Sequence, residues 1–270
     1  DVRDRARVLE VMQNVDVVIY AAALKQVPST EFNPTECLKT NVLGAENIIN
    51  ASIKCSVQKV IALSTDKAGN PINLYGASKL VSDKLFVSAN EIDKNSKTKF
   101  SVVRYGNVVG SRGSIVPYFK ELISKKSDFL PITDPKMTRF WITLQEGVDF
   151  VLKNFKRMKG GEIFVPKIPS VRIVDLAHAM APKLKQKIIG IRPGEKIHET
   201  MCPSEISHLT LEFKDHFVIC PSIQSKKISK YKKNNIGEVS ENVKMGFEYN
   251  SSTNKIFLST KEILKYNKIK

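Results

Sequence analysis

The stretch STDKAGNPINLYGASK, residues 64–79, brings together an acid, a phenol and two lysines. Tyr75 and Lys79 are four positions apart at the expected start of a helix, so their side chains lie on one face. An ammonium beside a phenol favours the phenolate and lowers the phenol pKa from its usual value near ~10. A positioned phenolate can take a hydroxyl proton while hydride leaves for a nicotinamide. The pair also fits the start of a solvent-exposed helix, so its spacing alone does not show that Tyr75 and Lys79 take part in chemistry.

Three further polar residues follow an apolar run at 59–64, which we expect to be a strand. They are Thr65, Asp66 and Lys67, at the carboxyl end of that strand, where ligands bind in open α/β sheets. The Thr65 hydroxyl can hydrogen-bond the same substrate oxygen as Tyr75. Asp66 also fits a turn-forming role and Lys67 a solvated surface position.

The elements that position these residues alternate between strands and helices. The expected strands are 15–22, 59–64 and 100–106, and the expected helices between them are 33–54 and 74–92. Asn33 and Asn73 are suited to cap the two helices. The inward face of the first helix is expected to carry Leu38, Val42, Ala45, Ile48 and Ile49. This alternation predicts an α/β fold with a doubly wound parallel sheet of the Rossmann type.

The rhythm breaks after Gly106, where a glycine-bearing loop (108–119) begins. We therefore expect a smaller α/β substrate-binding lobe whose segments interrupt and follow the sheet domain. The expected division assigns 1–110 and 138–166 to the sheet domain and 111–137 and 167–270 to the lobe. A dinucleotide-binding sheet normally begins with a strand and a GxGxxG turn, and the sequence contains neither. Either the chain binds no dinucleotide, or it lacks the first βαβ region of such a sheet.

Composition narrows the classes of function. The 270 residues carry a net charge of +16, which suits either an anionic ligand or a solvated Lys-rich surface. The lysines are scattered without an aromatic RNA-binding signature, so we expect no nucleic acid partner. The four cysteines and four histidines have no metal-ligand spacing, so we expect no metal. The longest apolar run, 15–24, is short and holds Asp16, so we expect no membrane span and a cytoplasmic protein with reduced thiols.

Several longer motifs together carry a resemblance over nearly the whole chain. A strand ending in Ser/Thr followed by YxxxK resembles the extended short-chain dehydrogenase/reductase superfamily that acts on nucleotide sugars. The narrower resemblance is to the inverting UDP-N-acetylglucosamine 4,6-dehydratases of pseudaminic acid biosynthesis. The motifs are ALSTDKAGNPINLYGASKL (62–80), AAALKQVP (21–28), TNVLGAENII (40–49), VRYGNVVGSRGSIVP (103–117), MTRFWIT (137–143) and IRPGEKIHE (191–199).

The resemblance implies a chemical role for each residue of the first motif. Tyr75, helped by Lys79, would remove the proton of the sugar 4-hydroxyl while hydride passes from carbon 4 to NADP. Lys67 would then take the carbon 5 proton, and Asp66 would protonate the departing 6-hydroxyl. Retaining relatives have Glu at the position of Lys67, so Lys here implies inversion at carbon 5.

The resemblance also implies binding residues, an amino-terminally truncated chain and a homo-oligomer. The implied cofactor contacts are Asp1, Val2, Ala21, Ala22, Ala23, Lys25, Tyr75, Lys79 and Val108. The implied substrate contacts are Lys25, Asn107, Arg112, Gly113, Ser114, Ile115, Val116, Arg139, Arg192 and Glu195. A salt bridge between the lobes is the alternative role for Arg139, Arg192 and Glu195. Two rival functions stay open: a 4-epimerase or retaining dehydratase on the same fold, and a non-catalytic binding module for a polyanion or a protein.

Overall fold

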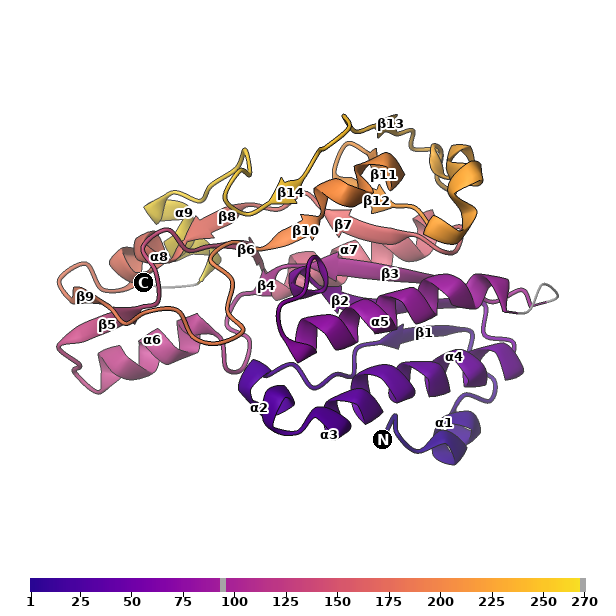
Figure 1. Ribbon diagram of the computed structural model, residues 1–270, viewed down its shortest axis with the longest axis horizontal. Coiled ribbons are helices and arrows are strands. Elements are labelled where there is room, and N and C mark those ends of the chain that lie inside the picture. The colour runs from indigo at the N-terminus through magenta and orange to yellow at the C-terminus, as the bar shows by residue number, and fades with distance from the viewer. Residues whose placement is uncertain (93–95, 268–270) are drawn as a thin grey trace.

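A computed structural model describes residues 1–92 and 96–267, with the side chains of 224–227 left aside. Its centre is a seven-stranded sheet (Figure 1). Strands in spatial order are β1 (Val17–Tyr20), β2 (Lys59–Thr65), β3 (Lys99–Tyr105), β7 (Ile163–Pro166), β12 (His216–Ile219), β11 (Thr210–Glu212) and β13 (Glu241–Asn242). The first four strands run parallel to one another. After β7, each of the strands β12, β11 and β13 pairs antiparallel with the strand before it in this order. The predicted parallel α/β sheet is confirmed.

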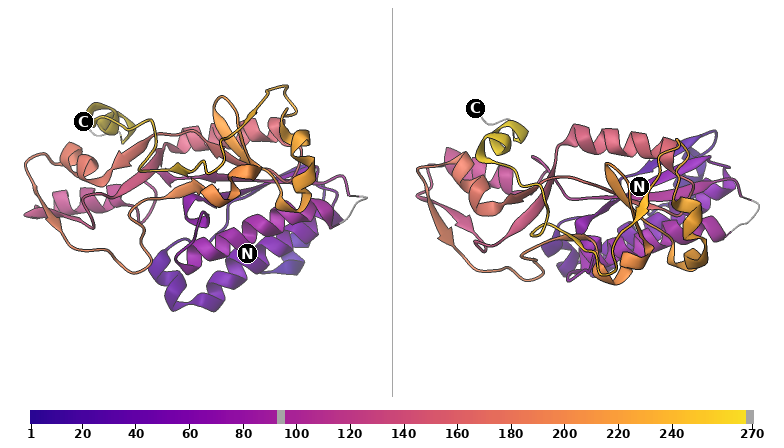
Figure 2. Two further views of the ribbon diagram at one scale, coloured as in Figure 1. Left: turned by 45° about the horizontal axis from the view of Figure 1, so that its top comes forward. Right: turned by 90° about the horizontal axis from the view of Figure 1, so that it is seen from above.

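Helices cover both faces of the sheet. Those around it are α1 (Arg5–Val11), α2 (Val27–Phe32), α3 (Pro34–Leu38), α4 (Gly44–Lys54), α5 (Leu74–Ser88) and α7 (Leu144–Arg157), with a π-helical turn, η1 (Lys39–Leu43), between α3 and α4. The indigo and violet helices α1, α4 and α5 lie on one face, and α7 (pink) lies on the other (Figure 2). Two separate apolar clusters fill these interfaces, one around Phe86 and Phe100 and one around Phe150 and Phe164.

The remaining elements form a second lobe at one end of the sheet (Figure 1). They include β4 (Asn107–Val108), α6 (Ile115–Ser124), β5 (Phe129–Ile132), β6 (Thr138–Ile142), β8 (Ser170–Arg172), α8 (Ile173–Met180), β9 (Lys185–Ile188) and α9 (Thr260–Tyr266). Strands β10 (Thr200–Cys202) and β14 (Tyr249–Asn250) form a short pair beside the sheet. Short 3₁₀ turns complete the set: η2 (Asp66–Ala68), η3 (Ala89–Glu91), η4 (Ser204–Leu209) and η5 (Ser222–Tyr231). The second lobe contains fewer residues than expected. The strands β11, β12 and β13 fall within 167–270, which was assigned to the lobe, yet they belong to the main sheet.

The caps and faces of two helices test the sequence reasoning in detail. Asn73 caps α5 as predicted, and its side chain accepts a hydrogen bond from Gly76 N at 2.8 Å. The cap expected from Asn33 is wrong: its amide donates to the Ser29 carbonyl instead. Leu38, expected inward, is 44% exposed. The π-helical turn that follows it adds a residue to one turn, so positions before and after it do not share the regular helical phase. Among the described residues, no helix is both long and apolar enough to cross a bilayer.

Candidate active site

The candidate site is built on the turn between β2 and α5. Strand β2 ends at Thr65, whose hydroxyl accepts a hydrogen bond from Lys67 N at 3.3 Å and so caps η2. The chain then turns through Gly69 and enters α5 at Leu74, fixed by the Asn73 cap. Thr65 and Asp66 are buried, and the Lys67 side chain is 24% exposed. A strand end, a 3₁₀ turn and a capped helix therefore hold the predicted residues close together.

Thr65, Asp66, Lys67 and Tyr75 form one polar cluster. The Thr65 hydroxyl donates to Asp66 Oδ1 at 3.0 Å, and Lys67 Nζ lies 3.1 Å from the same oxygen. The Tyr75 phenol shares a hydrogen bond with Thr65 and lies in the field of the Lys67 ammonium. The cluster thus places a phenol, a carboxylate and an amine at the carboxyl end of β2, as the sequence predicted.

The Tyr75 pKa differs from the sequence argument. Burial raises the pKa of Tyr75 to about 12, and the Lys67 ammonium and the Thr65 hydrogen bond oppose that rise only in part. The expected lowering is therefore wrong, because removal from water penalises the phenolate more than nearby charges favour it.

Lys79 lies one helical turn beyond Tyr75 on the buried face of α5 and is 2% exposed. Burial lowers the pKa of Lys79, and the carboxylate of Asp83, one turn further on, opposes that shift. The ammonium also lies 5.7 Å from the centre of the Tyr20 ring, at the end of β1. Asp83 itself pairs with Arg104 at 3.0 Å. The buried face of α5 is therefore polar, because it serves the site and an ion pair as well as the core.

Glu199 joins the cluster although the sequence argument assigned it no role. Its Oε1 lies 3.1 Å from Lys67 Nζ, and its side chain is 2% exposed. Burial alone would lower the pKa of Lys67, but the carboxylates of Asp66 and Glu199 outweigh it and raise that pKa above its ordinary value. Lys67 is therefore an ammonium in this structure. Glu199 was present in the IRPGEKIHE motif, but only the tertiary fold shows that it reaches the turn.

The segment that carries Glu199 packs tightly on the turn between β2 and α5. A Cβ on Gly69 would lie 2.1 Å from the Thr200 carbonyl oxygen, so only glycine permits this approach. Lys196 Nζ donates to the Gly69 carbonyl at 2.6 Å, and Asn73 Nδ2 donates to the Gly194 carbonyl at 2.7 Å. These contacts bind the lobe segment to both sides of the turn.

Three of the implied substrate contacts, Arg139, Arg192 and Glu195, lie in one network with this segment. Arg139 is 6% exposed, and its guanidinium donates to the backbone carbonyls of Thr138, Lys196 and Ile197. It also lies 3.8 Å from Glu199 and 3.9 Å from Glu195. Arg192 is exposed and pairs with Glu195 at 2.8 Å. These groups form the ion-pair network that the sequence left open, and their ligand contacts stay a prediction.

Two loops face each other beside the cluster. Residues 21–26 follow β1, and Asn41 fixes them by accepting from Leu24 N at 2.8 Å and donating to Leu24 O at 2.9 Å. Asn41 lies in the π-helical turn and was not foreseen as a site residue. A Cβ on Gly113, in the opposite loop, would lie 3.6 Å from Gln26 Nε2.

The predicted residues on these loops differ in exposure. Lys25, Arg112 and Gly113 are exposed, Ala22 and Ala23 are half-buried, and Val116 is buried in the apolar cluster of the lobe. Asn107 Oδ1 and Ser114 Oγ are buried and have no hydrogen-bond partner within the described ranges. At the other side of β1, Val2 packs against Gly44, and the Asp1 carboxylate pairs with Arg3.

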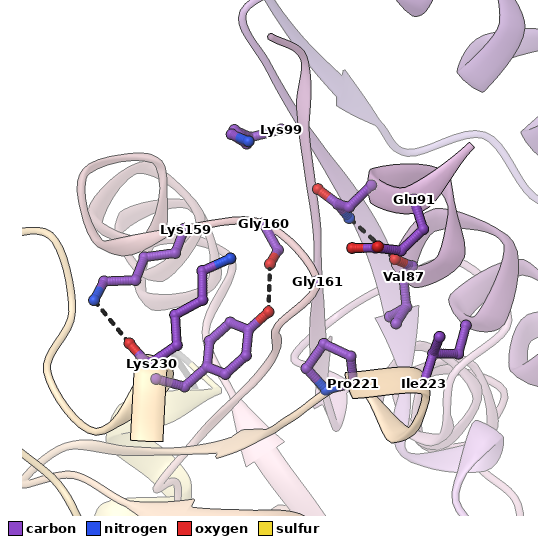
Figure 3. A pocket seen from close by; sticks show the side chains of 11 residues that line it. Val87, Glu91, Lys99, Lys159, Gly160, Gly161, Pro221, Ile223 and Lys230 are labelled. Carbon is purple, nitrogen blue, oxygen red and sulfur yellow. Dashed lines mark hydrogen bonds between the residues drawn. The ribbon is translucent and has the colours of Figure 1, made fainter. Parts of the chain in front are cut away.

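Two other features lie away from this cluster. A pocket enclosing about 430 Å³ of space, open mouth included, is lined by Lys99, Lys159 and Lys230 among others (Figure 3). Lys99 is the first residue of β3, whereas Thr65 is the last residue of β2. The pocket therefore lies at the amino-terminal ends of the parallel strands, opposite the candidate site. Elsewhere, ligand atoms of Asp215, His216 and Glu238 lie within 4.8 Å of one another. Arg157 pairs with both carboxylates, which makes this group an ion-pair network.

Comparisons with known proteins identify relatives of this chain. Residues 1–221 match the polysaccharide biosynthesis protein family. The chain is 59% identical to a UDP-N-acetylglucosamine 4,6-dehydratase (inverting) of Campylobacter jejuni, over 98% of this chain and 79% of that protein. It is 46% identical to a UDP-glucose 4-epimerase of Rickettsia canadensis, over 76% of this chain and 61% of that protein.

The chain is also similar to a solved structure. The X-ray structure of Pen from Bacillus thuringiensis superposes with a TM-score of 0.85 at 34% identity, and the match covers 97% of this chain and 77% of that one. These findings confirm the resemblance drawn from the sequence motifs.

Proposed function

Because the chain belongs to the polysaccharide biosynthesis protein family, we propose that it is a UDP-N-acetylglucosamine 4,6-dehydratase that inverts carbon 5. The observation that carries this proposal is the cluster of Thr65, Asp66, Lys67 and Tyr75 at the carboxyl end of β2. It supplies a phenol, a carboxyl group and an amine at one place, and oxidation at carbon 4 followed by loss of water needs each of them.

The product is UDP-2-acetamido-2,6-dideoxy-β-L-arabino-hex-4-ulose, which makes the enzyme a hydro-lyase. In this proposal the reaction is the first step of pseudaminic acid biosynthesis, with flagellin or another surface glycan as the destination. The enzyme would work in the cytoplasm as a homo-oligomer.

The residues present fit a nicotinamide cofactor, which we propose is NADP. The buried Asn107 Oδ1 has no donor among the described residues, and a carboxamide or a sugar hydroxyl would supply one. Half-buried Ala22 and Ala23 leave room beside the backbone, and Asp1, Val2, Ala21, Lys25 and Val108 are the further proposed contacts. When bound, the cofactor accepts hydride from carbon 4 and returns it to carbon 6.

In the proposed first step, Tyr75 takes the proton of the 4-hydroxyl. Thr65 already hydrogen-bonds the phenol and is placed to orient the same substrate oxygen. Because burial raises the pKa of Tyr75 to about 12, the phenolate needs the positive charges of Lys67 and Lys79 nearby. Lys79 is held on the same helix one turn away, buried and without contact with bulk water.

The elimination is assigned to Asp66 and Lys67. Oxidation at carbon 4 acidifies the proton on carbon 5, and Lys67 takes it as a neutral amine. Lys67 must first pass the proton that Asp66 and Glu199 stabilise on it to the Asp66 carboxylate, which leaves Lys67 a neutral amine and Asp66 a carboxylic acid. Asp66 then donates a proton to the departing 6-hydroxyl, which leaves as water. The buried Asp66 Oδ2, with no partner among the described residues, is the oxygen available for that proton.

We propose that the nucleotide binds between the two facing loops and the 192–199 segment. Arg192 is exposed and offers its guanidinium to the diphosphate, since its planar fork matches phosphate oxygens. Arg139, which lies 3.9 Å from Glu195, Glu195 itself and Lys25 are further proposed contacts. The loop residues Arg112, Gly113, Ser114, Ile115 and Val116 complete the proposed substrate contacts.

The test is a product analysis of the native gene product, including any residues that precede Asp1. The protein is incubated in deuterated water with UDP-N-acetylglucosamine and NADP⁺, and the product is followed by proton NMR. We expect a new methyl signal at carbon 6, deuterium at carbon 5 and couplings of the L-arabino configuration. Tyr75→Phe, which removes only the phenol oxygen, should lower the rate by about 10²–10⁴-fold.

Other outcomes assign other functions. A 4-keto-6-deoxy sugar with unchanged carbon 5 would mean retention, and the role of Lys67 would be wrong. Epimerised carbon 4 without a methyl signal would favour a 4-epimerase, in line with the Rickettsia relative. No turnover, together with salt-sensitive binding to polyanions, would support the binding module.

A further inference from the structure

Glu199 is a buried acid of the candidate site, and it has no role in the proposed reaction. It immediately precedes β10 and comes from the lobe segment that packs on the turn between β2 and α5. Its backbone is fixed by Ser251, whose hydroxyl accepts a hydrogen bond from Glu199 N at 2.9 Å. The side chain reaches Lys67 with Oε1, while Oε2 is buried without a hydrogen-bond partner in the part of the chain that the structure describes.

Burying a carboxylate with one oxygen unpaired is costly, so a merely structural Glu is poorly suited to this position. The cost is offset by two cations. Lys67 Nζ lies 3.1 Å from Oε1, and Arg139 Nε lies 3.8 Å from the same oxygen. Glu199 therefore links the ammonium of the turn to the guanidinium of β6.

The charged and titratable groups that face the Lys67 ammonium come from four elements. Asp66 belongs to its own turn, and Tyr75 lies on α5. Arg139 comes from β6, and Lys196 and Glu199 come from the segment before β10. Two carboxylates thus face two further cations and a phenol. Removing either carboxylate would leave the ammonium with one negative neighbour against Arg139 and Lys196.

We propose that Glu199 is a positioning residue for Lys67: with Asp66 it holds the ammonium in a two-carboxylate clamp and sets the pH at which Lys67 becomes a base. This inference rests on the proposed function, because it concerns the group assigned to the carbon 5 proton. It adds a residue of the second lobe to the control of a residue on the sheet domain. Contact between the two lobes then determines the charge of the base.

The first test measures the proton affinity of Lys67 without any turnover. The folded native protein is treated briefly with acetic anhydride across a pH series, and acetylation of Lys67 is followed by peptide mass spectrometry. Only the neutral amine reacts, so at each pH below the Lys67 pKa the acetylation rate is proportional to the fraction of neutral amine. In Glu199→Gln, which keeps the shape but loses the charge, we expect the rate profile to shift to lower pH by about 1–3 units, which is acetylation about 10–10³-fold faster at any one pH.

Glu248→Gln is the matched control. Glu248 is exposed, and its carboxylate accepts a hydrogen bond from the Thr200 hydroxyl at 3.0 Å. Within the described residues, no contact joins Glu248 to Lys67. We expect the same profile as the native protein. Glu199→Asp keeps the charge on a shorter side chain and should lie between the native protein and Glu199→Gln. If Glu199→Gln fails to fold, the direction of the Asp shift decides the question.

The second test uses the pH profile of deuterium incorporation at carbon 5. Its rising limb should move to lower pH in Glu199→Gln by the same amount as the acetylation profile. A uniform loss of rate at every pH, with neither the acetylation profile nor the deuterium profile shifted along the pH axis, would overturn the inference and leave Glu199 a structural residue. A native protein without turnover would instead refute the proposed function, while the acetylation profiles would still judge the clamp.

Discussion

Gly69→Ala gives the sharpest test of how the lobe packs on the turn between β2 and α5. Gly69 has φ −80° and ψ 114°, a conformation that alanine adopts without strain. The whole effect of the substitution is therefore steric. The added Cβ would lie 2.1 Å from the Thr200 carbonyl oxygen and 3.1 Å from its carbonyl carbon. Because both obstacles are backbone atoms, no side-chain rotation relieves the clash.

The expected magnitude follows from that geometry. Real Cβ contacts do not fall under 3.0 Å, so β10 and the turn must separate by at least about 0.9 Å. Overpacking of a well-packed site costs about 1–3 kcal/mol, and a backbone obstacle places this change at the upper end. Separation also weakens the neighbouring bond from Lys196 Nζ to the Gly69 carbonyl, now 2.6 Å long. We expect a loss of about 3 kcal/mol in the free energy of unfolding.

The assay is urea unfolding followed by circular dichroism, with Gly147→Ala as the control. Gly147 lies inside α7, and a Cβ there would meet nothing within 4 Å. Alanine is favoured over glycine in a helix, so this variant should gain up to about 1 kcal/mol. If Gly69→Ala proves as stable as Gly147→Ala, the close packing of β10 on the turn, and the reach of Glu199 to Lys67, would be refuted.

Three further predictions concern other parts of the fold. Arg104→Met should cost about 3–5 kcal/mol in urea unfolding, because it strands the buried carboxylate of Asp83 3.0 Å away, and the double variant with Asp83→Asn should recover part of that loss. The hydrogen bond from His216, with those from Arg157 and Lys153, holds the pKa of Asp215 well below its usual value. The ionised Asp215 therefore stabilises the fold above about pH 4, and this stabilisation is lost below that pH. Unfolding curves of the native protein and Asp215→Asn should differ at pH 7 and converge in acid, and a constant difference would contradict this. A thiol reagent should label half-buried Cys55 first and Cys202 and Cys220 only after unfolding, because burial raises the pKa of both to about 12; equal rates for the three thiols would contradict the burial.

Local pattern was sufficient to predict the sheet and the first site residues. The apolar runs at 59–64 and 100–106 became β2 and β3 within a residue of their expected ends, since a parallel strand covered on both faces has a continuous apolar sequence. Asn73 and the strand end at Thr65 then fixed the turn. Short-range chemistry of this kind is readable from neighbouring residues.

Contacts between distant segments were not readable in the same way. Nothing near Glu199 in the sequence signals that it reaches Lys67, and nothing near Leu38 signals the π-helical turn that follows it. The Tyr75 pKa was misjudged because the argument counted the neighbouring charge and could not weigh burial. The strands β11 and β12 were assigned to the lobe because the pairing of β12 with β7, and of β11 with β12, depends on the tertiary fold.

The two-carboxylate clamp also has a consequence for the order of folding. Asp66 and Lys67 leave the ribosome in the first half of the chain, whereas Glu199 and the Thr200 carbonyl leave it in the second half. Closing so long a loop is entropically slow, so the strands beside the turn can pair well before the clamp forms. During refolding, helical circular dichroism should therefore return before enzymatic activity. Activity would then report the last event of folding, the arrival of the lobe on the turn.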